Sequence, residues 1–261
     1  MTQVVEEAGV GSLLRTWRER RRFSQQELSN RSEVSTRHVS RVETGLAKPT
    51  AQMVLRLADV LDVPLRDRNR LLLAAGHAPT FPEHRLDHPD VAEIMDGLRH
   101  LLDAHLPYPA LLLDTHWDIV DANAAVDRLL AGCAAELLEP PVNVLRVSLH
   151  PDGLAPRIRN FEQWAAHLHH QVARRAEHTH DARHYELIAE IETYLKYRPA
   201  APAATGPVLP LEFEAEDGTL RFFSASARLD TASDGTLEGL HLETFLPADA
   251  DTRRALGAET M

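Results

Sequence analysis

The sequence predicts two domains of different fold class, an all-α domain of five helices followed by an α+β domain with a five-stranded antiparallel sheet and helices. Three observations predict this. Residues 11–76 show only helical periodicity, whereas residues 208–245 hold three segments of alternating apolar and polar residues. Charge also divides the chain: residues 1–76 hold 13 Lys and Arg against nine Asp and Glu, and the remainder holds 15 against 30. A chain of 261 residues is long enough for two such cores.

A helix-turn-helix layout is predicted for Ser24–Pro49. Two short amphipathic segments, Ser24–Arg31 and Ser35–Thr44, flank a break at Ser32–Val34. Each segment opens on a serine whose hydroxyl is able to cap the exposed amides of a helix, so both helix starts are marked.

The second segment has two distinct faces. At about 100° per residue, one arc of roughly 140° holds Thr36, Arg37, Ser40 and Arg41, and Val39 and Val42 lie opposite. Two guanidinium groups and two hydroxyls on one face suit a helix that enters the major groove of DNA. A solvated amphipathic helix accounts for this segment alone equally well.

The wider motif resembles the DNA-binding domain of the phage-repressor-like (XRE, Cro-type) family. The matching positions are Ser24, Gln25, Leu28, Val34, Ser35, Val39, Ser40, Glu43, Gly45 and Pro49, and the resemblance covers Gly11 to about Val63. It implies a DNA-binding role, which favours the first of the two interpretations. The acidic remainder of the chain would repel phosphate unless it is held away from it.

Site residues follow from this resemblance and from position. The expected base contacts are Ser35, Thr36, Arg37, Ser40 and Arg41. The expected phosphate contacts are Arg15, Gln25, Thr44 and Lys48. The resemblance also implies a structural ion pair between Arg18 and Glu43.

Three further helices complete the first domain, predicted as residues 1–76. They are Gly11–Arg22, a helix capped by Thr50, and a helix that starts at Pro64 and ends near Gly76. Met1–Val10 shows no periodicity and is expected to be frayed.

Residues 77–105 are predicted to be a linker and a connecting helix. His77–Asp90 carries three prolines, and Val91–Ala104 has a broad apolar stripe. Two partners fit that stripe, the second domain or the same helix of a second copy in a dimer.

The remainder predicts a sheet with helices across one face, enclosing a small cavity. The predicted strands are Pro109–Leu113, Trp117–Val120, Val208–Glu214, Leu220–Leu229 and Leu237–Phe245, with tight turns at Asp217-Gly218 and Asp234-Gly235. The predicted helices are Ala124–Leu130, Asn143–Leu149, Phe161–Glu177 and Ala182–Tyr197, the first capped by Asn123 and the third by Asn160, with a loop at Arg198–Pro207.

Three stretches of this part resemble the MmyB-like ligand-binding domain of bacterial regulators: Tyr108–Ala125, Asn143–Ala165 and Glu216–Thr252. The resemblance implies a PAS-like domain at residues 106–252, a tail at 253–261, and a pocket for a fatty-acid-like or other small hydrophobic molecule. The expected ligand-binding residues are Tyr108, Trp117, Arg157, Arg159, Asn160 and Trp164, with Arg157, Arg159 and Asn160 at the pocket mouth. The two tryptophans equally suit core positions.

Metal and catalytic chemistry are not predicted. Six histidines lie between His167 and His184, and His180 and His184 have the i, i+4 spacing of metal ligands. They lack the glutamate of an HExxH pattern, so a solvated helix face is favoured over a metal site. Nucleophile-elbow, phosphate-loop and dinucleotide motifs are absent from the sequence, which argues against an enzyme.

These features predict a cytoplasmic, soluble transcription regulator without a membrane partner. Its single cysteine, Cys133, suits a reducing compartment, and its sequence has no run of 18 apolar residues. The expected partners are double-stranded DNA, a second copy of the chain in a homodimer, and a small hydrophobic ligand such as a fatty acid, without another cofactor. Two alternatives stay open for the second domain: a ligand-free dimerisation or protein-interaction module, or a haem or flavin sensor.

Overall fold

The structure, a computed structural model, describes residues 9–197, 199, 207–215 and 218–257. The expected frayed end at Met1–Val10, the loop at Arg198–Pro207, the turn at Asp217 and the tail at 253–261 fall wholly or partly outside these residues. The chain divides into two compact units. The first unit is Met1–Leu86 together with Asp230–Glu238, and the second unit is Asp87–Leu229 together with Gly239–Met261.

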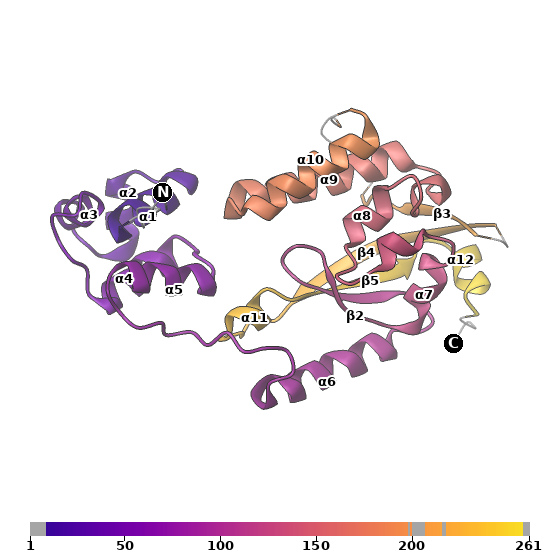
Figure 1. Ribbon diagram of the computed structural model, residues 1–261, viewed down its shortest axis with the longest axis horizontal. Coiled ribbons are helices and arrows are strands. Elements are labelled where there is room, and N and C mark those ends of the chain that lie inside the picture. Colours follow the sequence, from indigo (N-terminus) through magenta and orange to yellow (C-terminus); the bar gives the residue numbers. More distant parts are fainter. Residues whose placement is uncertain (1–8, 198, 200–206, 216–217, 258–261) are drawn as a thin grey trace, which may run out of the picture. The chain divides into compact units, whose positions relative to one another are not determined.

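Five helices form the N-terminal part of the first unit, as predicted: α1 (Val10–Arg20), α2 (Gln25–Ser32), α3 (Thr36–Glu43), α4 (Ala51–Val60) and α5 (Leu65–Ala74) (Figure 1). The predicted caps are present, since the hydroxyls of Ser24, Ser35 and Thr50 accept from backbone amides three residues on. The helices enclose one apolar core, which includes Leu14, Leu28, Val39, Leu57 and Leu72.

The second unit is the predicted five-stranded antiparallel sheet with helices, an α+β PAS-like fold. Its strands are β1 (Ala110–Leu113), β2 (Ile119–Ala122), β3 (Leu211–Ala215), β4 (Gly218–Arg228) and β5 (His241–Pro247), in the order β2-β1-β5-β4-β3. Its α-helices are α6 (Pro89–Ala104), α7 (Ala124–Leu130), α8 (Val144–Leu149), α9 (Phe161–Thr179), α10 (Ala182–Leu195) and α12 (Ala250–Ala255), with 3₁₀ turns η1 (Ala135–Leu138) and η2 (Ala155–Arg157).

The main core of the second unit lies between the sheet and the α8–α10 helices (Figure 1). Alternate residues of β1, β3 and β4 reach it, as the pleat of a β-strand requires. Leu111 and Leu113 of β1 and Phe245 of β5 pack there with Trp164 and Val172 of α9.

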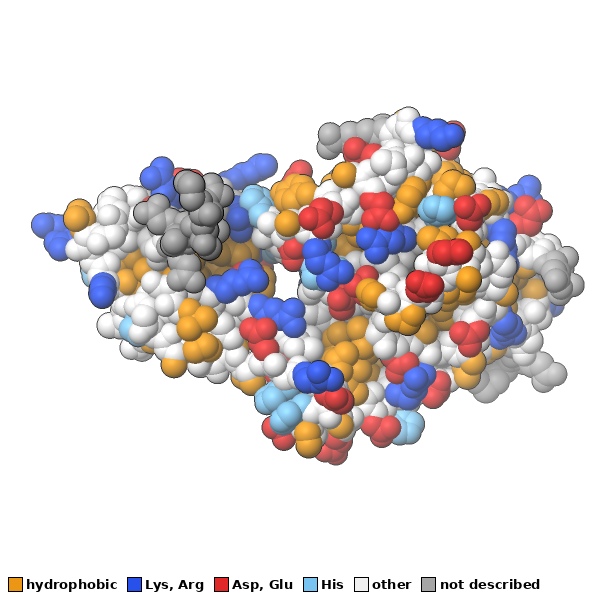
Figure 2. All heavy atoms as spheres, viewed as in Figure 1, with side chains coloured by type: hydrophobic (Ala, Val, Ile, Leu, Met, Phe, Trp, Pro, Cys, Tyr) orange, Lys and Arg blue, Asp and Glu red, His pale blue; other side chains and the backbone are white. Residues whose placement is uncertain are grey.

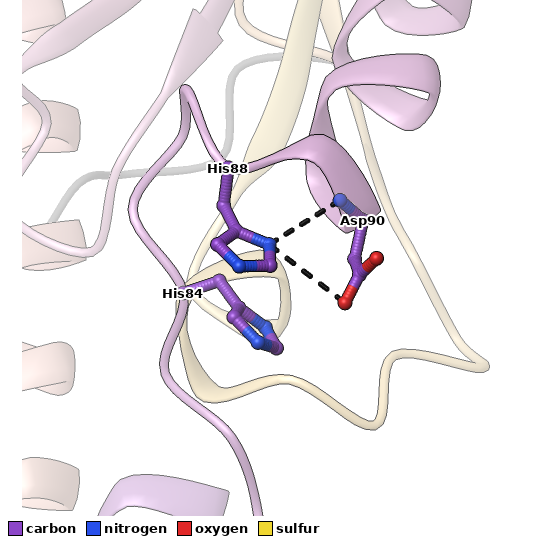
Figure 3. A group of neighbouring side chains, drawn as sticks. All are labelled: His84, His88 and Asp90. Carbon is purple, nitrogen blue, oxygen red and sulfur yellow. Dashed lines mark hydrogen bonds and ion pairs between the residues drawn. The ribbon is translucent and has the colours of Figure 1, made fainter.

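Helix α6 lies on the other side of the sheet (Figure 1), where Val91 and Leu102 are buried and Ile94 and Leu101 stay exposed, so a contact with a second copy stays a prediction. Leu102 is fully buried there, and Arg99 Nη1 donates to the carbonyl of Ala122 on β2 at 2.9 Å. His88 caps the N-terminus of α6, since its Nδ1 accepts from the amide of Asp90 at 3.3 Å (Figure 3). His84, also drawn in Figure 3, belongs to the first unit.

Two local predictions are wrong. Asp234-Gly235 does not form a tight hairpin turn: Asp234 Oδ1 accepts from the amides of Thr236 and Leu237 and starts helix α11 (Gly235–Glu238). Strand β5 consequently begins at His241 and not at Leu237. Asn160 does not cap α9 with its side chain, because its amide group bonds instead to the backbone at the start of β3.

Candidate nucleic-acid interface and ligand-binding domain

Helix α3 presents the two faces that its sequence predicts. Val39 and Val42 are each 1% exposed and pack into the core of the first unit, while Arg37 and Arg41 are exposed on the other side. Arg41 Nη2 approaches the carbonyl of Leu46 at 3.3 Å. Arg37 makes no hydrogen bond or ion pair with another described residue. Its guanidinium is therefore available to a base or a phosphate.

The hydroxyl groups at the start of α3 already have partners. Ser35 Oγ accepts from the amide of His38 at 3.3 Å as the helix cap, and Thr36 Oγ1 donates to Gln26 Oε1 at 3.0 Å. Gln26 is exposed on α2, and it is not among the DNA contacts predicted from the sequence. Gln26 follows Gln25 at the start of a helix, and this position is the sequence signal for a further candidate DNA contact.

Glu43 fixes the back of the recognition helix to α1 and α2. Arg18 Nε lies 2.7 Å from Glu43 Oε1 and Arg18 Nη2 lies 2.9 Å from Glu43 Oε2, with side chains only 10% and 3% exposed. The hydrogen bonds that Arg18 donates to Glu43 raise the pKa of Arg18. Gln25 Nε2 also donates to Glu43 Oε2, at 2.8 Å. A side-chain amide carries two N–H groups, so a second N–H of Gln25 remains beside the one bonded to Glu43.

The other expected phosphate contacts differ in how free they are. Arg15 pairs with Glu19 at 2.8 Å in an exposed i, i+4 ion pair, and Thr44 Oγ1 donates to the carbonyl of Ser40 at 2.8 Å. Lys48 is exposed and has no polar partner within the described part of the chain. Lys and Arg side chains stand out on the visible surface of the first unit (Figure 2).

The expected pocket mouth in the second unit is bonded to the protein itself. Arg157 Nη1 donates to the carbonyls of Ala131 at 2.7 Å and Leu129 at 3.2 Å. Arg159 Nη1 donates to Thr219 Oγ1 at 2.9 Å. Asn160 Nδ2 donates to Pro210 at 2.7 Å and its Oδ1 accepts from Glu212 at 3.0 Å. These three groups thus join their segment to other parts of the second unit: Asn160 to the start of β3, Arg159 to β4, and Arg157 to the end of α7.

The three aromatic candidates occupy different surroundings. Trp164 is 4% exposed in the core, and its ring lies 5.4 Å from that of His167. Tyr108 precedes β1, with its ring 5.8 Å from that of His105. Trp117 is 6% exposed and lies between His184 and His241, at ring distances of 5.7 and 6.4 Å.

The histidine-rich segment is not uniformly solvated, which corrects the sequence interpretation. His169 is 4% exposed, and its Nε2 pairs with Glu192 Oε1 across α9 and α10 at 3.0 Å. His184 is 1% exposed and bonds to Thr179 Oγ1 and to the carbonyl of Thr115, both at 2.9 Å. Burial lowers the pKa of His184, which favours its neutral ring. These two histidines join neighbouring elements of the second unit.

An open pocket of about 410 Å³ lies in the first unit, beside α5. It is lined by Arg66, Asn69, Arg70, Leu73, Pro79, Phe81 and Glu83. It is therefore separate from the domain that is expected to bind a ligand.

Comparison with known families gives two matches. A model of the MmyB-like transcription regulator ligand binding domain matches residues 94–258, and a model of a helix-turn-helix domain matches residues 10–71. No curated protein matches the chain. Among solved structures, an RNA-binding light-oxygen-voltage receptor aligns with 95% of this chain at 15% identity and a TM-score of 0.27, and this chain spans 62% of that receptor chain. No described helix is both long and apolar enough to cross a membrane.

Proposed function

The chain belongs to the family that carries the MmyB-like transcription regulator ligand-binding domain, and we propose that it is a one-component regulator whose operator binding responds to a small hydrophobic ligand. At the level of its two domains it is a DNA-binding transcription regulator with a ligand-binding domain. Neither of the matched families is a family of enzymes.

One observation carries the DNA-binding part of the proposal. Helix α3 offers the unpaired guanidinium of Arg37 to solvent, while its opposite side is fixed by buried valines and by the Arg18–Glu43 pair. A rigid helix with a basic outer face suits the major groove, where a guanidinium recognises guanine O6 and N7. Thr36, Ser40 and Arg41 complete the proposed base-reading face, and Ser35 lies at its N-terminal end.

The proposed arrangement on DNA is a homodimer on a palindromic operator. Two copies of α3 would then lie about 34–36 Å apart, one turn of B-DNA, as in other helix-turn-helix dimers. Arg15, Gln25, Thr44 and Lys48 would contact phosphates and set the orientation of each helix.

The proposed ligand is a fatty-acid-like or similar small hydrophobic molecule bound between the sheet and the α8–α10 helices. A ligand that binds one arrangement of the dimer better than another shifts the population toward it. The family match of the second domain supports a ligand, and the apolar side chains between sheet and helices suit a hydrophobic one.

In vitro selection of random duplex DNA with the full-length protein tests the DNA-binding part. We expect a palindromic consensus. Arg37→Ala should lose about 1–3 kcal/mol of operator binding and relax the preference at one position of each half-site. Lys48→Ala should weaken binding to all sequences alike, and Arg70→Ala, which changes an exposed arginine of α5, should have little effect. Unchanged affinity and preference in Arg37→Ala would remove α3 as the reading helix.

Native mass spectrometry of the purified protein tests the ligand and dimer parts. A dimer that releases a small hydrophobic molecule supports both. Release of haem or flavin would support a cofactor sensor in place of a fatty-acid sensor. An empty dimer that binds no added fatty acid would favour a ligand-free interaction module.

A further inference from the structure

His241 is a buried polar group with an unused nitrogen. It is the first residue of β5, it is 6% exposed, and its Nδ1 has no hydrogen-bond partner within the described part of the chain. Burying a polar atom without a partner costs free energy. Alternation along β5 places His241 on the same side of the sheet as Phe245, which lies in the core between sheet and helices.

Two arginines lie near this histidine. Arg228 is its direct cross-strand partner on β4. The Arg175 guanidinium of α9 lies 5.5 Å from the centre of the Trp117 ring, and the same ring lies 6.4 Å from His241. Burial and repulsion from the two arginines lower the pKa of His241 to about 4. Burial and the charge of Arg228 lower the pKa of Arg175 to about 10.

No carboxylate neutralises this group directly. Neither Arg175 nor Arg228 makes an ion pair or a side-chain hydrogen bond with a described residue. Asp114, the nearby acid, accepts instead from the amides of His116 and Asp118, at 2.7 and 2.9 Å. On the inner side of β5, burial raises the pKa of Glu243, which favours its uncharged form.

The backbone of Trp117, whose ring lies beside His241, is strained. Its φ is 64°, in the left-handed region that bulky residues rarely occupy. Such strain persists only where the surrounding structure enforces it, and it concentrates at ligand sites. The indole lies near both the Arg175 guanidinium and the His241 ring.

We propose that Arg175, Arg228 and His241 form a subsite for the anionic group of the ligand, a carboxylate or phosphate attached to an apolar chain. The proposal rests on the proposed function of the second unit as a ligand-binding domain. Two guanidinium groups and an imidazole N–H match the acceptor oxygens of either anion. The apolar chain would continue along the inner face of the sheet, past Leu113 and Phe245. This places the anionic group away from Arg157, Arg159 and Asn160.

NMR titration of the full-length protein, with ¹⁵N-labelled histidine, tests the subsite. The probes are octanoate, inorganic phosphate and octanol, the last being the uncharged match of octanoate. We expect saturable shifts of the His241 ring nitrogens with one or both anions and not with octanol. Arg175→Gln should weaken anion binding roughly 10- to 100-fold, as loss of a hydrogen bond between charged groups does. Arg174→Gln, its exposed neighbour, is the matched control.

The melting temperature of the ligand-free Arg175→Gln variant provides a second test of the subsite. Removing a half-buried, unpaired guanidinium should leave the melting temperature unchanged or raise it, because the like charge of Arg228 is relieved. Lower anion affinity without lower stability separates a binding role from a structural one.

Three outcomes separate the proposals. If neither anion shifts His241, or if Arg175→Gln binds octanoate as tightly as wild type, the subsite is wrong. If octanol alone binds, the proposal of a hydrophobic ligand is supported, and the proposal that the ligand carries an anionic group is wrong. If octanoate binds through Arg175 without changing operator affinity, the subsite stands and the proposed regulation fails.

A second, independent observation concerns the connection between β4 and β5. Its residues Asp230–Glu238 belong to the first unit, with the helix-turn-helix. Glu238 Oε2 accepts from the amide of Leu65, the first residue of α5, at 2.8 Å. Asp234 Oδ2 accepts from His84 Nδ1 at 2.8 Å and from the His84 amide at 3.0 Å. The amide of Gly235 donates to Pro82 at 2.9 Å.

Gly235 makes this close packing feasible. An added Cβ would lie 3.0 Å from Arg66 Cγ and 3.1 Å from Glu83 Cγ. A carboxylate at the N-terminus of α5 also matches the positive end of the helix dipole. The segment is therefore built into the DNA-binding unit, although its two ends continue directly into the strands of the ligand-binding domain.

We infer that this connection transmits ligand binding to the helix-turn-helix. Arg228 is the last residue of β4 and His241 is the first residue of β5, and the two are paired in the sheet. A ligand bound to both would therefore contact the two ends of the connection and shift their positions. The inference rests on the proposed regulation. It names Asp234 and Glu238 as the residues that join the connection to the DNA-binding helices.

Hydrogen exchange at Leu65, measured on the full-length protein, tests the docking. Glu238→Gln should speed exchange of this amide by roughly tenfold, because a charge-assisted hydrogen bond is weakened. Asp230→Asn, an exposed position in the same segment, should leave it unchanged. Equal exchange in wild type and Glu238→Gln would contradict the docking.

Operator titrations with and without octanoate test the transmission. Asp234→Ala should reduce the effect of octanoate on operator affinity while octanoate binding stays as in wild type. An undiminished effect in this variant would contradict the inference. If octanoate has no effect on wild type, transmission fails together with the proposed regulation, whatever the exchange result.

Discussion

At the scale of single residues, Glu43 organises the candidate DNA-binding surface. Its carboxylate joins Arg18 of α1 and Gln25 of α2 to the last residue of α3. The pair is almost fully shielded from water, so its geometry is held by short, charge-assisted hydrogen bonds. Loss of the carboxylate charge would leave the Arg18 guanidinium shielded and poorly compensated.

Glu43→Gln should therefore destabilise the first unit by about 3–5 kcal/mol, as breaking a buried ion pair does. Thermal or urea unfolding measures this. The matched control is Glu27→Gln, which breaks the exposed Glu27–Arg31 pair and should change stability by only about 0–1 kcal/mol. Equal effects of the two substitutions would show that the Arg18–Glu43 pair has no special role.

His116 makes a pH-dependent contribution to the second unit. Hydrogen bonding to Asp114 and to Asp181, the latter at 2.8 Å from Nε2, raises the pKa of His116. A raised folded-state pKa stabilises the fold fully below the unfolded value of about 6.5, and this stabilisation is lost as the pH rises through the folded value. The stability difference between wild type and His116→Gln should thus shrink from pH 6 to pH 8. Unfolding titrations at both pH values measure it, with the exposed His170→Gln as control. A difference that grows with pH would contradict this assignment.

At the scale of elements, Gly11 allows helices α1 and α3 to pack closely against each other. An added Cβ there would lie 2.3 Å from the carbonyl oxygen of Val42 and 2.8 Å from that of Glu43. The end of the recognition helix thus packs directly on the backbone of α1. Only glycine allows this approach.

Gly11→Ala should force α1 and α3 apart and lower the stability of the first unit by about 1–3 kcal/mol, the usual effect of overpacking. Operator affinity should fall as well, because the end of α3 moves. Gly9→Ala is the matched control, since an added Cβ at Gly9 meets no atom within 4 Å. Calorimetry and an operator titration measure both effects, and wild-type behaviour of Gly11→Ala would refute the close contact.

The sequence predicts those helices whose start or core-facing side is marked by residues within the helix itself or next to it. The hydroxyl caps of α2, α3 and α4 and the apolar periodicity of the first unit lie within a few residues of the helices they specify. The prediction of a tight turn at Asp234-Gly235 is wrong because an Asp-Gly pair occurs both in tight hairpins and at helix starts. His84, whose hydrogen bond holds Asp234 at the helix start, lies far away in sequence. Asn160 is misassigned for the same reason: its amide binds β3 in preference to its own helix.

The ligand site shows a further limit of sequence reasoning. Arg175, Arg228 and His241 come from α9, β4 and β5. Strand register pairs Arg228 with His241, and helix packing brings Arg175 to the Trp117 ring beside His241. The arginines at the matched motif, Arg157 and Arg159, instead bond to the protein. A cation at the pocket mouth stays a prediction, and the positions of Arg175, Arg228 and His241 are a proposal.

At the scale of the whole molecule, charge separates the two functions. The first 76 residues are weakly basic and the remainder is strongly acidic, so phosphate contact is favoured only through the helix-turn-helix. In the proposed function, ligand binding and operator binding are coupled through equilibria between states, and thermodynamic linkage makes such a coupling reciprocal.

The most direct test of the central claim is the affinity of the full-length protein for its selected operator, measured with and without saturating octanoate. We predict a change of roughly 5- to 150-fold, with operator DNA changing the affinity for octanoate by the same factor. An operator affinity that is identical in the two titrations, with octanoate shown to be bound, would contradict a ligand-responsive regulator.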